Sequence, residues 1–184
     1  GAVGVDRPQA PDALVAQAAA RFGDHSFLKQ IAAEDIAARL GAINRQFDRV
    51  LDLGAHDGLL ARTLRQDAFL APRLGEIVTA DLAAAFRPDV IADEEALPFA
   101  EASFDLVVSA LSLHWANDLP GALIQIRRVL KPDGLFIGTV LGGRTLTELR
   151  QSLLSAEEEV RGGAANRVSP YLDVIDGAGL LQRT

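Results

Sequence analysis

The chain has 184 residues, of which 49% are hydrophobic, a length and composition that suit one domain with a sizeable core. Its net charge of −7 argues against a general positive field for binding nucleic acid or an anionic membrane. The lack of cysteine excludes disulfides, thiolate metal sites and a cysteine nucleophile, and no apolar run approaches the roughly 20 residues of a membrane span.

The N-terminal part of the chain divides into an irregular start and a helix. Residues 1–11 show no periodicity and lack the basic start and apolar core of a signal peptide, so we expect them to be disordered. We expect residues 12–184 to form a single domain. Between Ser26 and Ile43, apolar residues recur at steps of three and four, which predicts a helix that packs on a sheet. They are Leu28, Ala32, Ile36, Leu40 and Ile43.

The segment Arg49–Gly58 reads as a buried strand, a tight turn and the start of a helix. The strand is apolar apart from Asp52, as expected of a parallel strand that is covered on both faces. Gly54 permits a positive φ and a close approach of the backbone to a ligand, and Gly58 lets the following helix pack against the strand. Ligands of open α/β sheets bind at this edge, beyond the carboxyl ends of the strands.

Two more strands are predicted downstream, each ending in a carboxylate. They are Glu76–Asp81 and Asp89–Asp93. Only seven residues separate Asp81 from Asp89, whereas a crossover between parallel neighbours, helix included, usually takes at least about 10–12. We therefore predict either that residues are missing from the sequence around Ala83–Arg87 or that this crossover is irregular and not helical.

Strands and helices continue to alternate through the second half of the chain. The predicted elements are a strand at Ser103–Ser109, a helix at Pro120–Leu130, a turn at Lys131–Gly134, a strand at Leu135–Leu141 and helices at 145–160 and 173–181. This alternation indicates an α/β fold: a doubly wound, mainly parallel sheet with helices on both faces.

Carboxylates follow each of the first three strands, at Asp52, Asp81 and Asp93. A carboxylate after the second strand can accept hydrogen bonds from both hydroxyls of a ribose, and one after the third can meet an adenine amino group. Asp52 and Asp57 would repel the pyrophosphate of a dinucleotide, and the glycines lack the G-x-G-x-x-G spacing. S-adenosylmethionine has no phosphate, and its sulfonium and ammonium groups suit an acidic rim.

Five motifs in this order resemble the class I S-adenosylmethionine-dependent methyltransferases, over roughly Arg49 to Leu181. They are Val50–Gly58, Thr79–Asp81, Ala92–Phe99, Phe104–Ser109 and Leu130–Gly134. More narrowly, four segments resemble the branch that contains the mitochondrial complex I assembly factor with a methyltransferase fold and its bacterial relatives. They are Ala92–Phe99, Leu111–Pro120, Lys131–Gly138 and Gly142–Arg150. A more distant similarity is to the malonyl-carrier-protein methyltransferases of biotin synthesis.

The resemblance implies a set of residues that contact S-adenosylmethionine. The set is Asp52, Gly54, Ala55, Gly58, Asp81, Leu82, Asp93, Glu94, Ser109 and Leu111. In the family, the first turn holds the methionine end, Asp81 holds the ribose, and Asp93 with Glu94 holds the adenine. Ser109 and Leu111 would border the reactive methyl group.

The chain departs from the family pattern in two places. His56 stands at the central glycine of the G-x-G-x-G turn, where we expect it to narrow the pocket or tilt the loop. The chain also ends at Thr184, before the closing pair of strands that the family places there, so we expect a C-terminally incomplete domain with an exposed sheet edge or a truncated protein.

His114 is the one candidate catalytic residue. It could take a proton from an acceptor during attack on the methyl group, or it could make a structural hydrogen bond beside Trp115. Arg144 and Arg150 follow the last strand and could pair with a carboxylate of an acceptor. We propose no metal site, because His56 and Asp57 lack further identifiable ligands.

These observations predict a methyltransferase that acts by direct in-line transfer to an unknown acceptor, either a protein side chain or a small acid. Because the resembled assembly-factor branch is associated with arginine hydroxylation on a partner protein, a protein arginine hydroxylase is an alternative. A cofactor-binding assembly factor for respiratory complex I, without turnover, is a third. We expect a location in the bacterial cytoplasm, or in the mitochondrial matrix if the source is eukaryotic, and possible partners include a respiratory complex subunit.

Overall fold

The computed structural model describes residues 26–142, 145, 147–148, 151–152 and 179–182. The chain divides into two compact units, residues 1–139 together with Thr184 and residues 140–183, and each is considered by itself. The helices of the described part include none that is long and apolar enough to span a bilayer. The predicted disordered start at 1–11 and the candidate acceptor residues Arg144 and Arg150 lie outside the described residues.

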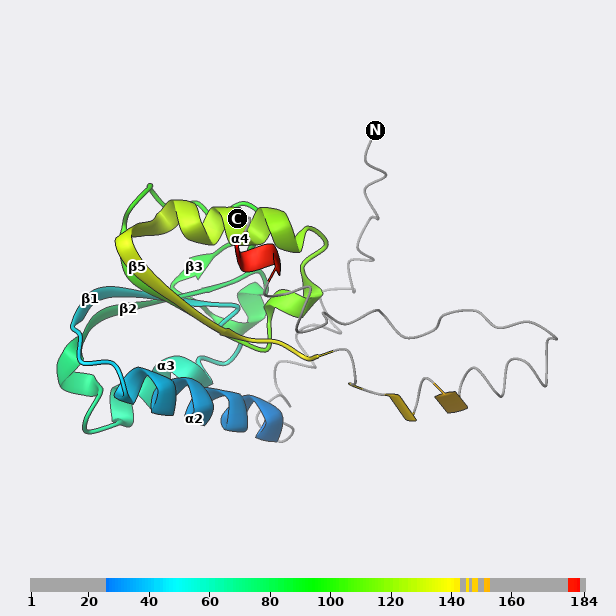
Figure 1. Ribbon diagram of the computed structural model, residues 1–184, viewed down its shortest axis with the longest axis horizontal. Coiled ribbons are helices and arrows are strands. Elements are labelled where there is room, and N and C mark those ends of the chain that lie inside the picture. Colours follow the sequence, from blue (N-terminus) through cyan, green and yellow to red (C-terminus); the bar gives the residue numbers. More distant parts are fainter. Residues whose placement is uncertain (1–25, 143–144, 146, 149–150, 153–178, 183–184) are drawn as a thin grey trace. The chain divides into compact units, whose positions relative to one another are not determined.

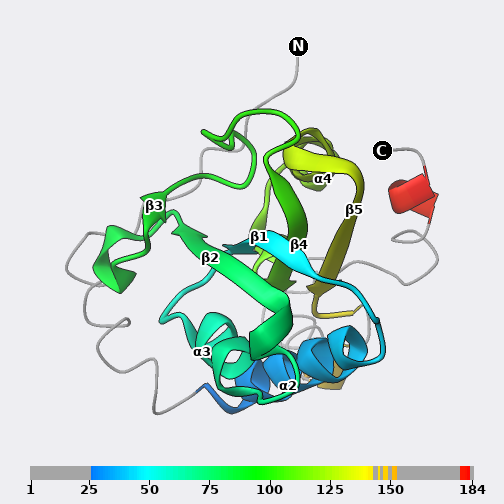
Figure 2. The ribbon, with the colours of Figure 1, turned by 90° about the vertical axis from the view of Figure 1, so that its left-hand side faces the viewer.

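The first unit is a parallel sheet with helices on both faces. Its elements are α2 (Phe27–Gly41), β1 (Phe47–Leu53), α3 (Leu59–Gln66), η2 (Ala71–Arg73), β2 (Leu74–Asp81), η3 (Ala84–Phe86), β3 (Val90–Ile91), β4 (Phe104–Ala110), η4 (Leu113–Trp115), α4 (Leu119–Val129) and β5 (Leu130–Thr139). The strand order is β3-β2-β1-β4-β5, and all four pairings are parallel. Figures 1 and 2 show α2 and α3 on one face of the sheet and α4 on the other. The predicted doubly wound α/β fold is confirmed.

Strand β1 lies at the centre of the sheet and is buried on both faces. Val50, Leu51 and Leu53 have no exposed surface, and β1 pairs with β2 on one side and β4 on the other. The core under α2 and α3 joins Val50 to Leu60 and Leu64 of α3 and to Leu106 of β4. The continuous apolar run of β1 is therefore explained by its central position, which also fixes the place of the turn that follows it.

The face that α2 buries differs from the prediction at one position. Leu28, expected on the apolar face, is 50% exposed, whereas Lys29 is only 4% exposed. The buried residues are Lys29, Ala32, Ala33, Ile36, Ala37 and Leu40. The prediction for Leu28 was wrong, because the buried face of α2 at its N-terminal end includes the next residue, Lys29, in place of Leu28.

The connection between β2 and β3 is irregular, as predicted. Its only regular part is the three-residue 3₁₀ turn η3, and Arg87 then adopts a left-handed conformation with φ of 55°. Asp89 closes the connection, because its carboxylate accepts hydrogen bonds from the amide and the hydroxyl of Thr79, both at 2.8 Å. Strand β3 contains two residues instead of the predicted five.

The later elements agree with the prediction except at their ends. Helix α4 stops at Val129. The segment Lys131–Gly134 was predicted as a turn, but it belongs to β5. This part of β5 is irregular, because Asp133 has a φ of 64° and the pairing with β4 shifts in register between Phe104 and Leu106. Most of the predicted helices at 145–160 and 173–181 lies outside the described residues, although residues 147–148, 151–152 and 179–182 are helical. The single domain over 12–184 and its missing closing strands stay predictions.

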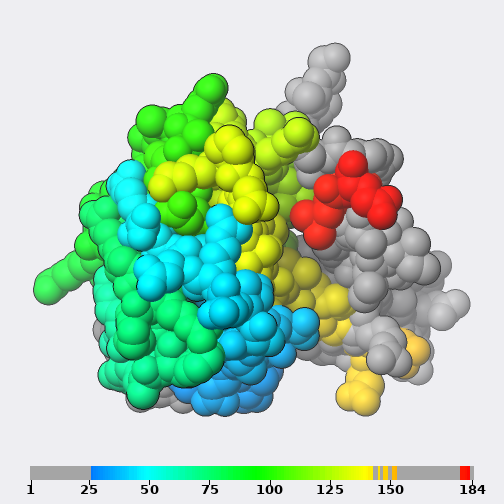
Figure 3. Space-filling model, turned by 60° about the vertical axis from the view of Figure 1, so that its left-hand side comes forward, coloured from blue at the N-terminus to red at the C-terminus, as the bar shows by residue number. Residues whose placement is uncertain are grey.

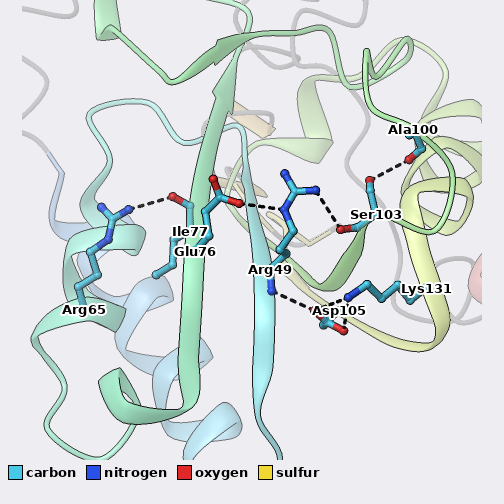
Figure 4. Close-up of polar contacts among 8 residues, drawn as sticks. All are labelled: Arg49, Arg65, Glu76, Ile77, Ala100, Ser103, Asp105 and Lys131. Atoms are coloured by element: carbon cyan, nitrogen blue, oxygen red, sulfur yellow. Dashed lines mark hydrogen bonds and ion pairs between the residues drawn. The ribbon is translucent and has the colours of Figure 1, made fainter.

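The amino ends of the strands are joined by ion pairs and hydrogen bonds around Arg49 (Figure 4). Its side chain bonds Glu76 of β2 at 2.9 Å, and its amide donates to Asp105 of β4, which also pairs with Lys131 of β5 at 3.0 Å. Figure 3 shows the start of β1 beside the start of β5, where Arg45 bonds the main chain of β5. These contacts hold four strands in register at the edge opposite the glycine turn.

Candidate functional site

Three residues in the turn after β1 have a positive φ, a backbone conformation that few residue types adopt without strain. Gly54 and Gly58 have φ of 68° and 73°, and His56 between them has φ of 50°. A Cβ atom on Gly54 would lie 2.0 Å from Ser112 Oγ, so Gly54 is required by space as well as by conformation. The amides of Gly54 and Ala55 donate to the carbonyl of Ala80, which ties the turn to β2.

Asp52, at the carboxyl end of β1, is fully buried beneath this turn. Its Oδ2 accepts a hydrogen bond from the Ala61 amide of α3 at 3.1 Å, and its Oδ1 is buried without a hydrogen-bond partner. Burial raises the pKa of Asp52 to about 6, although the positive charge of Lys29 and the Ala61 hydrogen bond act in the opposite direction. Asp52 therefore presents one unused acceptor at the base of the turn.

Asp81, at the carboxyl end of β2, joins the first turn to the second. One carboxylate oxygen accepts the His56 amide and the other accepts the Ala83 amide, both at 2.8 Å. Because a carboxylate offers about four lone-pair sites, these two bonds leave room for two hydroxyl donors. Leu82 follows and is 50% exposed, so it can cover the flat face of a ligand that Asp81 holds.

The third turn, after β3, is connected to the segment after β4. Asp93 is half-buried and accepts the amide of Glu95 at 2.9 Å. Glu94 is 9% exposed, and its carboxylate accepts the hydroxyl of Ser112 at 2.6 Å, next to the Gly54 turn. Glu95 accepts the amides of Asn117 and its neighbour in the chain, where α4 begins. Glu94, which was predicted to contact an adenine, therefore also connects the turn after β3 to the segment after β4.

The segment after β4 brings Ser109, Leu111 and His114 to the same edge. Ser109 is fully buried, and its hydroxyl has no hydrogen-bond partner. Leu111 has a φ of 54°, which is costly for a branched side chain, and its amide donates to Thr139 of β5. The His114 ring lies 5.0 Å from the ring of Trp115, whose indole is 63% exposed. Burial lowers the pKa of His114, and the charge of His56 lowers it further.

Sequence reasoning missed Lys29, which reaches the glycine turn from α2. Its ammonium donates to the carbonyls of Ala55 and Gly54 at 2.8 and 3.2 Å and contacts Nδ1 of His56 at 2.6 Å. Burial lowers the pKa of Lys29 to about 8, against the effect of nearby carboxylates. The signal was present in the sequence, because Lys29 is in helical register with Ala32, Ala33 and Ile36, and a lysine on an apolar stripe needs a buried partner.

The site as a whole is an acidic rim around one buried cation. Asp52, Asp57 and Asp81 all raise the pKa of Lys29 through their charge. Asp57 also pairs with Arg62 at 2.9 Å on the exposed side. In the described ranges, no three His, Cys, Asp or Glu side chains are grouped so that they could hold a metal ion.

Comparison with known proteins shows a similarity to the methyltransferases. Residues 51–138 match the methyltransferase domain family, a range that runs from the glycine turn to β5. The chain has the fold of the class I methyltransferases and is similar to them in sequence. It is 46% identical over 167 residues to the human protein named arginine-hydroxylase NDUFAF5, mitochondrial, covering 85% of this chain and 47% of that protein. It is 34% identical over 161 residues to the malonyl-[acyl-carrier protein] O-methyltransferase of Enterobacter lignolyticus, covering 82% of this chain and 61% of that protein.

Solved structures agree with this methyltransferase fold. A putative methyltransferase of Haloferax volcanii, in complex with the Trm112 methyltransferase activator, aligns with a TM-score of 0.66 at 20% identity over 92% of this chain and 74% of its own. The chain spans about half the length of NDUFAF5, so the activity, substrates and partners of the whole protein remain to be proposed.

S-adenosylmethionine is the cofactor of this domain, and the site has the chemistry to receive it. The cofactor carries a sulfonium and an ammonium, which suit the carboxylates at the turn, and the unused Oδ1 of Asp52 is an acceptor for such a donor. The unpaired hydroxyl of Ser109 is a second buried group without a partner. All the predicted contact residues except Leu82 are buried or half-buried, and their individual roles stay predictions.

Proposed function

We propose that this domain transfers the methyl group of S-adenosylmethionine to an acceptor by direct in-line displacement. The observation that carries the proposal is the carboxylate rim at the glycine turn, in which Asp81 bonds the amides of two turns and retains free lone pairs. When bound, the cofactor supplies a sulfonium methyl group that a lone pair of the acceptor can attack. Methyl transfer then needs little beyond alignment of the reacting atoms, so proximity can supply most of the rate.

Most of the predicted contact residues have a role in this proposal. Asp52 and the Gly54–Gly58 turn hold the methionine end, and Asp81 holds the ribose. Asp93 accepts the adenine amino group, and Glu94 supports that turn through its bond to Ser112. Ser109 and Leu111 border the methyl group, where the strained backbone of Leu111 fixes the direction of the loop that carries His114.

His114 is proposed as the base that takes a proton from the acceptor. Its pKa lies below the ordinary value of 6.5, so the ring is neutral near pH 7 and can accept a proton. Whether a base matters depends on the acceptor. An ionised carboxylate has no proton to lose, so His114→Ala should change its methylation rate little, whereas an N–H or O–H acceptor should lose roughly 10²–10⁴-fold.

The acceptor is proposed to be a protein side chain or a small carboxylic acid. The similarity to a malonyl-[acyl-carrier protein] O-methyltransferase supports a carboxylate, and the similarity to NDUFAF5 supports a protein arginine. We place the protein in the bacterial cytoplasm, or in the mitochondrial matrix if it is eukaryotic, with a respiratory complex subunit as its candidate partner. The mitochondrial location in the name of the animal relatives supports the second location.

Arginine hydroxylation is the second candidate function. It is favoured by the 44–46% identity to four vertebrate proteins named arginine-hydroxylase NDUFAF5, which is higher than the identity to the O-methyltransferase. An assembly factor that binds the cofactor without turnover is the third. Since one fold can carry all three functions, the products decide between them.

Cofactor binding is the first test. Calorimetric titration of the full chain with S-adenosylmethionine is expected to give saturable binding, and Asp81→Ala should weaken it by roughly 10–100-fold, because a charged acceptor of two ribose hydroxyls is lost. Asp48→Ala is the matched control, since Asp48 is an exposed aspartate at the amino end of β1. Equal affinity of the two variants would refute the assignment of Asp81, and preferential binding of a nicotinamide dinucleotide would refute the cofactor.

Product analysis then separates the three functions. The protein is incubated with methyl-labelled S-adenosylmethionine and either a carboxylate-bearing carrier protein or an arginine peptide. Label on the acceptor supports methyl transfer, and a gain of one oxygen on arginine without label supports hydroxylation. Cofactor binding with neither product supports the assembly factor and refutes the proposed reaction.

A further inference from the structure

The carboxylate of Glu94 is buried and only partly satisfied. Glu94 is 9% exposed, and within the described part of the chain its carboxylate accepts a hydrogen bond from the hydroxyl of Ser112 alone, at Oε1 and 2.6 Å. No lysine, arginine or histidine of that part forms an ion pair with Glu94. Because a carboxylate offers about four lone-pair sites, Oε2 remains able to accept from a ligand.

This arrangement is costly for the folded protein. A buried carboxylate that has neither a cation nor a full set of donors loses its hydration without compensation. The next acid of the same turn differs, because Glu95 is half-buried and accepts the amides of Asn117 and Asp118 at 2.6 and 3.1 Å. The burial of Glu94 at the rim of a cofactor site is explained if a ligand brings a cationic donor to it.

The carboxylate of Glu94 lies at the first turn, although Glu94 itself belongs to the turn after β3. A Cβ atom on Gly54 would be 3.4 Å from Oε1 of Glu94, and the side chain of Ser112 packs directly on the same glycine. Asp93 differs, because its Oδ1 accepts the amide of Glu95 at 2.9 Å within the turn after β3. The two neighbouring acids therefore serve different parts of the site, and Glu94 is the one that reaches the glycine turn.

The methionine end of S-adenosylmethionine is the part that the proposed function places at this turn. It carries an ammonium with three N–H groups, whereas the adenine amino group is uncharged and the sulfonium has no N–H to donate. A hydrogen bond between an ammonium and a carboxylate is roughly twice as strong as one between neutral groups. Asp52, two residues before Gly54, offers a second buried acceptor in its unused Oδ1. The ammonium is thus the cofactor group that best compensates the burial of Glu94.

We propose that Glu94 binds the ammonium at the methionine end of S-adenosylmethionine and not the adenine, and that Ser112 orients its carboxylate for this contact. Oε1 accepts the Ser112 hydroxyl, and Oε2 accepts from the ammonium. Asp93 alone then serves the adenine amino group. The inference rests on the proposed function, since it assumes that the cofactor binds with its methionine end at the first turn. It makes Glu94 the residue that selects ligands with an amino group at that end.

The test compares two ligands that differ only in this amino group, S-adenosylhomocysteine and its desamino analogue. Both keep the adenine and the carboxylate, and neither has a sulfonium. They are titrated by calorimetry into the full chain and into Glu94→Gln, whose amide oxygen can still accept the Ser112 hydroxyl. Glu94→Gln is expected to lose roughly 10–100-fold in affinity for S-adenosylhomocysteine and less than about 3-fold for the desamino analogue. Glu101→Gln changes an exposed glutamate before β4 and, as the matched control, should lose neither.

The ratio of the two affinities keeps the test valid if a variant is partly unfolded, because both ligands report on the same folded fraction. An equal loss for both ligands would overturn the proposal, since it would place Glu94 at the adenine that they share, and no loss for either would overturn it too. A loss for S-adenosylmethionine that S-adenosylhomocysteine does not show would contradict it by assigning Glu94 to the sulfonium. A wild-type chain that binds neither S-adenosylmethionine nor S-adenosylhomocysteine would instead refute the proposed function and the inference together.

Two further variants test the division of roles. Ser112→Ala is expected to weaken S-adenosylhomocysteine by roughly 3–10-fold and to leave the desamino analogue unchanged, because the orientation of Glu94 is lost. Asp93→Asn should weaken both ligands by the same factor, since both carry the adenine amino group. An unchanged ratio in Ser112→Ala, or a loss from Asp93→Asn confined to S-adenosylhomocysteine, would show that the roles are assigned wrongly.

Discussion

Replacing Asp52 with asparagine should stabilise the protein at neutral pH. Asp52 is fully buried, and its pKa is raised from 3.8 to about 6. Because the folded-state pKa is higher than the unfolded one, the folded protein keeps this proton longer, and stability is lost as the pH rises through the interval between the two values. At about 1.36 kcal/mol per pH unit, the ionised carboxylate lowers the free energy of unfolding by about 3 kcal/mol above pH 7.

The assay is urea denaturation of wild type and Asp52→Asn at pH 4.5 and pH 7.5 without cofactor. The asparagine oxygen can still accept the amide of Ala61, so the variant keeps the hydrogen bond that Oδ2 of Asp52 makes. The free-energy difference between variant and wild type should grow by about 2 kcal/mol between the two pH values, because Asp52 ionises in the folded protein in this interval. Other carboxylates cancel in the difference.

Asp48→Asn is the control, since it changes an exposed aspartate on the same strand and should give a difference that does not vary with pH. If the Asp52→Asn difference is also constant between pH 4.5 and 7.5, the reasoning is wrong. In that case the charge of Lys29 compensates fully for the burial of Asp52, and the two residues act as a stable ion pair.

Three further changes test the packing around the site. Gly54→Ala should lower the free energy of unfolding, measured by denaturant titration, by about 2–4 kcal/mol, because Gly54 has a φ of 68° and the new Cβ would meet Ser112 Oγ. Adding Ser112→Gly to this variant should recover part of the lost free energy. Arg128→Met should cost about 2–3 kcal/mol in thermal unfolding, since its guanidinium bonds two carbonyls of the loop before β4 at 2.8 Å. Glu76→Ala, which breaks an exposed pair with Arg49, should cost less than about 1 kcal/mol.

Contrary results would be informative in each case. A neutral Gly54→Ala change would mean that the turn can adopt another conformation, and no recovery from Ser112→Gly would assign the whole loss to backbone strain. An Arg128→Met variant as stable as wild type would show that water can replace the guanidinium. A large loss from Glu76→Ala would show that the amino ends of the strands depend on this pair.

The first turn could be predicted from the sequence because its information is local. A continuous apolar run, a carboxylate and two glycines specify a buried strand, a turn with positive φ and a helix, and the structure places all three at Arg49–Gly58 and beyond. The parallel sheet follows from the alternation of elements. The irregular crossover between β2 and β3 could also be predicted from the sequence, because seven residues are too few for a helical crossover.

The contacts that hold the site together could not be predicted, because they join residues that are distant in the chain. Lys29 is 26 residues from Ala55, and Ser112 is 18 residues from Glu94. No local sequence pattern predicts that a lysine on α2 will contact the turn after β1. The sequence offers only the lysine within an apolar stripe, and the identity of its partners is decided by how α2 crosses the sheet.

The shortness of β3 has a consequence for local unfolding. Strand β1 is held by ladders on both sides, whereas β3 is joined to β2 by only two residue pairs, Ala80 with Val90 and Asp81 with Ile91. Amide hydrogens in β3 should therefore exchange with solvent through small openings, long before those of β1. The half of the site that carries Asp93 is the half that opens first, and a ligand bridging it to the first turn would slow exchange most in β3.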